Sequence, residues 1–84
     1  MAKPMLFTQH ALDAVAERQL DPVWVELTVF EPHWQEADPG NPDVIRRFRA
    51  IPERGGRYLR VALVETSAEI RILSAFLDRR ARPK

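Results

Sequence analysis

The stretch Arg57–Arg80, RYLRVALVETSAEIRILSAFLDRR, decides the fold of this chain. It holds two apolar runs, Tyr58–Val64 and Ile70–Leu77, separated by the polar break ETSAE at residues 65–69. Neither run contains Pro or Gly, and both are rich in aliphatic and β-branched residues, which predicts two paired strands with a tight connection. Because the first run is apolar on both faces, it is predicted to be a central strand. In the second run, alternation places Ile70, Ile72 and Phe76 on one face and Leu73, Ala75 and Leu77 on the other.

Two short helices are predicted upstream of this hairpin. Thr8 is a favourable N-cap for the segment Gln9–Leu20. Asp21-Pro22 ends that segment and begins a second helix, which Pro32 stops. Helical spacing predicts their buried residues as Leu12, Val15, Ala16 and Leu20 in the first helix, and Val23, Trp24, Leu27 and Phe30 in the second.

Further strands are predicted between the helices and the hairpin. His33–Asp38 is a candidate edge strand, the turn DPGNP follows at residues 38–42, and Val44–Ile51 is the next strand. The apolar start Leu6-Phe7 fits either a strand or an arm. Helices that precede strands predict an α+β fold, with two N-terminal helices packed on one face of a three- to four-stranded antiparallel sheet. The 84 residues make one domain, with a basic tail at residues 79–84.

The composition excludes several kinds of site. The chain has no cysteine, which rules out disulfides and thiolate metal sites, and its two histidines are too few for a closed zinc site without carboxylates. No apolar run reaches the roughly 18 residues of a membrane span, and the start MAKPMLF is too short for a signal peptide. We therefore expect a cytoplasmic protein without membrane contact, metal or cofactor. A chain this short has a small core, which favours stabilisation by a partner or as a homodimer.

The net charge of +1 conceals an uneven distribution along the chain. Residues 1–45 contain two basic and eight acidic residues, whereas residues 46–84 contain eleven basic and four acidic residues. Ten of those eleven are arginines, whose planar fork of donors suits phosphate and carboxylate groups. Two interpretations stay open at this point: the basic half neutralises the acidic half within the fold, or it binds an anionic partner.

The segments FTQHALDAVAERQL and DPVWVELTVFEP, residues 7–32, resemble the opening of DUF 4258, a bacterial family of unknown function. The end of the chain, RYLRVALVETSAEIRILSAFLDRRAR, resembles the last two strands of that family. The residues in matching positions are Thr8, His10, Ala11, Arg18, Pro32, Phe76, Asp78 and Arg79. The family is similar in topology to the RelE/ParE-type and BrnT-type toxins of bacterial toxin–antitoxin pairs, many of which cut messenger RNA without a metal. By this fold-level analogy, the resemblance implies an RNA-binding protein or a metal-independent ribonuclease with an antitoxin partner.

Metal-free RNA cleavage needs a general base, a general acid and cations for the phosphate. His10 is the candidate general acid–base, because histidine exchanges protons near neutral pH, and Arg79 is a candidate phosphate contact. Guanidinium groups pair with phosphate oxygens and a tyrosine ring can stack on a base. On these grounds the candidate RNA-binding residues are Arg47, Arg49, Arg57, Tyr58, Arg60 and Arg71.

Structural roles stay open for several of these residues. His10 is equally suited to form a hydrogen bond with a neighbouring strand, and His33 is predicted to be a loop residue with a structural role. Arg18 is predicted to pair with Asp13 or with a tail residue rather than with a ligand. The second function left open is a non-enzymatic module that docks a protein partner or dimerises through its sheet.

Overall fold

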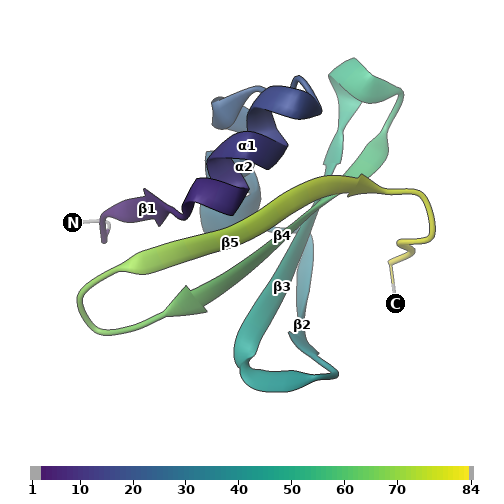
Figure 1. The fold of residues 1–84 in the computed structure, drawn as a ribbon. Coiled ribbons are helices and arrows are strands. Elements are labelled where there is room, and N and C mark those ends of the chain that lie inside the picture. The colour runs from purple at the N-terminus through teal and green to yellow at the C-terminus, as the bar shows by residue number, and fades with distance from the viewer. Residues whose placement is uncertain (1–2, 84) are drawn as a thin grey trace.

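The structure is a computed structural model, which describes residues 3–83 of the chain. Its elements follow one another as β1 (Met5–Phe7), α1 (Gln9–Glu17), α2 (Pro22–Phe30), β2 (Trp34–Asp38), β3 (Asn41–Ile51), the short 3₁₀ helix η1 (Pro52–Arg54), β4 (Arg57–Glu65) and β5 (Ile70–Asp78). The predicted α+β class is confirmed, because both helices precede the antiparallel strands β2 to β5 and lie on one side of a twisted sheet (Figure 1).

The sheet has five strands in the order β1-β5-β4-β3-β2. The predicted antiparallel strands are β2 to β5, and each pairs with its neighbour in sequence. The fifth strand, β1, runs parallel to β5, with Met5 opposite Ile70 and Phe7 opposite Ile72. The apolar start of the chain therefore forms a strand rather than an arm, since Met5 and Phe7 pack against the buried core.

The hairpin of β4 and β5 lies at the centre of the molecule, as predicted. Leu59, Val61 and Leu63 are completely buried, and β4 pairs with a strand on each side. The hydroxyl of Thr66 accepts hydrogen bonds from the main-chain N–H groups of Ala68 and Glu69, at 3.2 and 3.1 Å. A threonine that binds the following N–H groups in this way closes a tight turn without glycine.

Each helix begins at the predicted cap, but its buried residues match the prediction only in part. Leu20 is buried and Val15 and Trp24 pack against the core, as predicted, whereas other predicted positions are exposed. The Thr8 side chain accepts from the N–H of Ala11, and the Asp21 side chain accepts from the N–H of Val23. In α1 the buried residues are Ala11 and Ala14, whereas Leu12 is 49% exposed. Small side chains let this helix approach β5 closely, so the alanines and not the leucine occupy the interface.

The second helix is apolar on most of its surface, and so its sequence does not define one face. Val25, Thr28 and Val29 are buried, and the predicted core residues Val23 and Phe30 are 57% and 40% exposed. Thr28 tolerates burial because its hydroxyl donates to the carbonyl of Trp24 at 2.7 Å. The helix rests on β3 and β4, beside α1 (Figure 1).

Candidate functional site

Two of the predicted RNA-binding residues, Arg47 and Arg49, hold the end of α2. The Nη1 of Arg47 donates to the carbonyl of Val29 at 2.9 Å, and its Nη2 donates to Oε1 of Glu65 at 3.0 Å. Arg49 donates to the carbonyl of Glu31 at 2.5 Å. The last carbonyls of a helix lack intrahelical partners and carry partial negative charge, so cations stabilise them. Both arginines are therefore engaged in contacts within the fold.

Tyr58 and Arg60 lie on the opposite face of the sheet, away from the helices. The strand register places four side chains in one row across this face: Trp34, Phe48, Arg60 and Phe76. The guanidinium carbon of Arg60 lies 4.2 Å from the centre of the Phe76 ring, and its Nη1 lies 3.4 Å from Oδ2 of Asp78. Burial lowers the pKa of Arg60, nearby Arg46 lowers it further, and Asp78 opposes both effects. Arg60 is thus packed into this face rather than presented to solvent.

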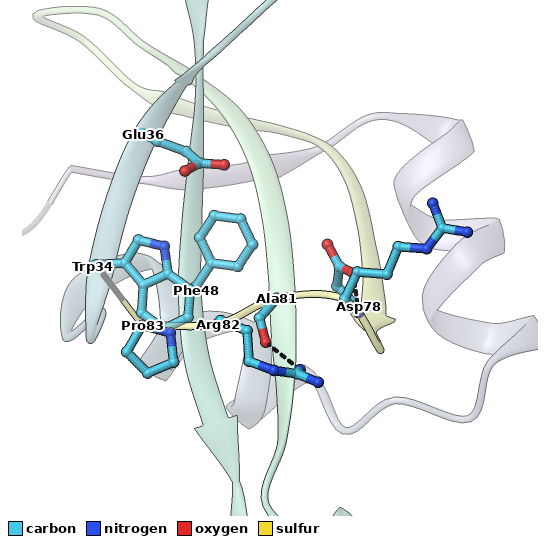
Figure 2. Close-up of a pocket in the computed structure, with 8 residues that line it drawn as sticks. Trp34, Glu36, Phe48, Asp78, Ala81, Arg82 and Pro83 are labelled. Atoms are coloured by element: carbon cyan, nitrogen blue, oxygen red, sulfur yellow. Dashed lines mark hydrogen bonds between the residues drawn. The ribbon is translucent and has the colours of Figure 1, made fainter.

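The C-terminal segment, residues 79–83, folds back over the same face (Figure 2). Beneath it the rings of Trp34 and Phe48 stack at 4.7 Å, and Tyr58 meets Trp34 edge to face at 4.9 Å. Ala81 in the segment is only 8% exposed. A hollow of about 350 Å³ remains, lined by Trp34, Glu36, Phe48, Asp78, Arg80, Ala81, Arg82 and Pro83. The ring of Tyr58 therefore belongs to a packed aromatic cluster.

Arg71 lies at the other end of β5, close to the hairpin turn. Its side chain is 58% exposed and pairs with Glu69 at 3.1 Å. Since exposed ion pairs contribute little energy, the contact with Glu69 holds the Arg71 side chain only weakly. It stands apart from the other predicted contacts, however, so it forms no cluster of cations with them.

The cluster that the structure does form consists of Arg18, Arg57 and Arg79, and we call it the arginine hollow. The hollow measures about 240 Å³, and the rest of its lining is apolar: Leu20, Phe76 and Leu77. Arg18 is the C-cap of α1, Arg57 begins β4, and Arg79 directly follows β5. All three arginines are exposed, and among residues 3–83 no side chain or carbonyl accepts a hydrogen bond from their guanidinium groups.

Among residues 3–83, no carboxylate side chain lines the arginine hollow, because acids near it in sequence are used elsewhere. Asp78 accepts from the N–H of Arg80 at 2.9 Å and pairs with Arg60 on the other face of the sheet. Asp21 caps α2. Arginines keep their charge throughout the physiological pH range, so three positive charges line this hollow.

Sequence reasoning selected Arg57 and Arg79 for this role, and the structure brings the two together. It missed Arg18, one of whose predicted partners was Asp13. The carboxylate of Asp13 instead accepts from Nε2 of Gln9 at 2.9 Å. Arg18 reaches the hollow because α1 lies along β5 and ends where β5 ends, which is a property of the topology rather than of any local motif.

His10 lies at the opposite end of α1 from this cluster. It is exposed in the first turn of the helix, and no hydrogen bond or ion pair of its side chain occurs within residues 3–83. Eight residues separate it from Arg18, which corresponds to about 12 Å along a helix axis. The structure therefore does not bring the candidate acid–base group to the candidate phosphate contact Arg79. His33, by contrast, has a structural contact, because its Nδ1 accepts from the N–H of Ala50 at 3.3 Å.

Residues 3–83 contain neither a metal-binding cluster nor a helix that could span a membrane. No group of three or more His, Cys, Asp or Glu side chains within residues 3–83 is arranged to hold a metal ion. Within the same residues, no helix has the length and hydropathy needed to cross a bilayer.

Comparison of the chain with protein-family models, with curated proteins and with solved structures finds no match. The resemblance to DUF 4258 accordingly stays a prediction.

Proposed function

We propose that the protein binds RNA through the arginine hollow. The observation that supports this function is the convergence of Arg18, Arg57 and Arg79 on one hollow without any acidic partner there. Guanidinium groups bind phosphate oxygens through paired, charge-assisted hydrogen bonds, and such contacts supply much of the affinity of proteins for nucleic acids. The three side chains are exposed, so they give up few contacts within the fold when they donate hydrogen bonds to a phosphate.

A single strand fits this surface better than a duplex does. Both helices carry exposed acids on their outer surfaces, Asp13 and Glu17 on α1 and Glu26 on α2. These charges repel phosphate, so neither helix suits a groove of duplex DNA. The floor of the arginine hollow is apolar, with Leu20 and Leu77, and it offers a ribose or a base of a single strand a surface next to the phosphate contacts.

Binding is the part of the function that the geometry supports. A metal-independent ribonuclease of the toxin type needs an acid or a base within hydrogen-bond reach of the phosphate. The residues that line the hollow include no His, Asp or Glu, and His10 stands at the far end of α1. A phosphate bound in the hollow would contact guanidinium groups and apolar side chains, without a general acid or base beside it.

The test is the affinity for a fluorescently labelled single-stranded RNA, measured by anisotropy at several salt concentrations. Arg57→Gln and Arg79→Gln should each weaken binding about three- to tenfold and make it less dependent on salt, since each removes charge-assisted contacts to phosphate. Arg71→Gln makes the same charge change at the other end of β5 and is the matched control. Equal losses in all three variants, or no binding by the wild type at low salt, would contradict the proposal. Gel analysis of the same mixtures reports any cleavage.

The second candidate function is docking of a protein partner, and the free edge of β2 favours it. In the described structure β2 pairs with β3 alone, so its outer edge offers unpaired main-chain groups. A strand of an antitoxin or of a second copy could add here, over the short length between Pro32 and Pro39. Slower amide exchange in residues 34–38 at higher protein concentration, together with a dimeric mass in solution, would support this candidate.

A further inference from the structure

We propose that the arginine hollow binds the terminal phosphate of an RNA strand, a phosphomonoester, rather than a phosphodiester within the strand. This inference rests on the proposed RNA binding and specifies which part of the RNA the hollow recognises. It follows from how the cations are arranged, from what surrounds them and from the chemistry of the two kinds of phosphate.

The first step is the arrangement of the cations. Arg18, Arg57 and Arg79 come from three different elements and converge on one hollow of about 240 Å³. A protein that follows an internal stretch of backbone needs cations spaced along a groove, one for each successive phosphate. Convergent cations instead place several donors around a single phosphate.

The second step concerns the other arginines near this cluster: Arg54 and Arg60 make contacts within the fold, and Arg80 lines the hollow on the other face of the sheet, so in the described structure the cluster is not continued by a row of cations on its own face. Arg54 donates to the carbonyl of Gln19 at 2.7 Å, and its guanidinium lies 5.3 Å from the centre of the Trp24 ring. Arg60 is held between Phe76 and Asp78. A strand leaving the hollow therefore finds few free cations for its next phosphates.

The third step is the charge and the number of oxygens of the ligand. A terminal phosphate carries a charge between about −1.5 and −2 near neutral pH and presents three acceptor oxygens. An internal phosphodiester carries one charge and has two non-bridging oxygens. Three guanidinium groups without an acidic neighbour can thus satisfy a terminal phosphate more fully, and they compensate its second charge, which a diester does not have.

The fourth step is the floor of the hollow. Leu20 and Leu77, on the helix side of the sheet, line it with apolar side chains, and Leu20 is 5% exposed. Such a floor offers an apolar surface to the last ribose or base of a strand that ends there.

The test compares single-stranded RNA oligonucleotides of one sequence that carry a 5′-phosphate, a 3′-phosphate or hydroxyl groups at both ends. Affinity is measured by anisotropy, with the label placed at the end opposite the phosphate and, for the hydroxyl form, at each end in turn. We expect one phosphorylated form to bind about tenfold or more tightly than the hydroxyl form, since the additional contacts are charge-assisted. Whether the 5′- or the 3′-phosphate gives the gain identifies the end that is bound.

Variants show whether the gain arises in the hollow. Arg57→Lys keeps the charge but loses the planar fork, so it should reduce the ratio between phosphorylated and hydroxyl RNA to about twofold while much of the affinity for hydroxyl RNA remains. Arg80→Gln is the matched control, because Arg80 is also exposed but lines the other hollow, beneath the C-terminal segment, and the ratio should not change. Circular dichroism confirms that both variants are folded.

Two results would overturn this inference in distinguishable ways. Equal binding of all three RNAs by the wild type would leave RNA binding in place and refute recognition of the terminal phosphate. An absence of binding to every RNA would refute the proposed function itself, and competition by a phosphopeptide alone would assign the hollow to a protein ligand. A ratio that survives Arg57→Lys but falls with Arg80→Gln would place the site outside the arginine hollow.

Discussion

Arg47 donates a hydrogen bond of 2.9 Å from Nη1 to the carbonyl of Val29, and this bond ties the middle of the sheet to the last turn of α2. The same guanidinium binds the carboxylate of Glu65 at 3.0 Å. We expect Arg47→Ala to lower the free energy of unfolding by about 1.5–3 kcal/mol, the range for hydrogen bonds to a charged group. Urea unfolding followed by circular dichroism measures this change.

The control for this prediction is Arg71→Ala. Arg71 has a side chain that is 58% exposed and one partner, Glu69, so its removal should change the free energy of unfolding by less than about 1 kcal/mol. Equal effects of the two substitutions would show that the contact of Arg47 with α2 is not a stabilising one.

The C-terminal segment shields the aromatic cluster through Ala81, and this gives a second prediction. Ala81 is 8% exposed, so a carboxylate at position 81 would be buried, and Ala81→Asp should detach the segment through the cost of desolvating the charge. In a Trp24→Phe background, the emission of Trp34 should then move to longer wavelength. Ala68→Asp, in the exposed turn after β4, should leave the spectrum unchanged. An unshifted spectrum for Ala81→Asp would mean that the segment does not cover Trp34 in solution.

Glu65 makes the stability depend on pH. Hydrogen bonds from Lys3, at 2.7 Å, and from Arg47 hold the pKa of Glu65 below its usual range, and burial offsets only part of this effect. An unfolded chain gives glutamate a pKa of about 4.3. The contribution of Glu65 is therefore complete above that pH and is lost as the pH falls through the lower pKa of the folded state.

We expect Glu65→Gln to reduce the pH dependence of the unfolding free energy between about pH 5 and 3. Urea midpoints measured across this range provide the check. In an Arg47→Ala background the effect should be smaller, because one of the two cations is already gone. A wild-type stability that stays constant across this interval would contradict the role given to Glu65.

His10→Ala should leave both RNA affinity and stability almost unchanged, within about twofold and 0.5 kcal/mol. The side chain is exposed and lies about 12 Å along α1 from the arginine hollow. Anisotropy with the same RNA and a thermal melt provide the measurements. A large loss of affinity would show that the RNA extends along α1 to its first turn.

The caps, the central hairpin and the α+β class were predictable because each depends on local sequence. Thr8 and Asp21 cap the helices as predicted, and the two apolar runs pair as predicted. These features follow from short-range hydrogen bonds and from apolar alternation, which the sequence displays directly.

The faces of the elements were harder to predict. The pairing of β4 and β5 shifts register after Ala62, so that Leu73 is an extra residue in β5, and beyond it Ala75 is buried with Ile72 while Phe76 turns to the other face. A bulge of this kind interrupts strict alternation and leaves no reliable mark in the sequence. Arg18 was missed as a site residue for a related reason, because its closeness to Arg57 and Arg79 arises from how α1 lies on β5.

The most direct measurement is a titration of isotopically labelled protein with single-stranded RNA, followed through the side-chain Nε–Hε signals of the arginines. RNA binding in the arginine hollow predicts that the signals of Arg18, Arg57 and Arg79 shift with a common affinity. The signal of Arg47, which is engaged with Val29 and Glu65, should stay in place. Shifts confined to other arginines, with those three signals unmoved at saturation, would contradict the central claim.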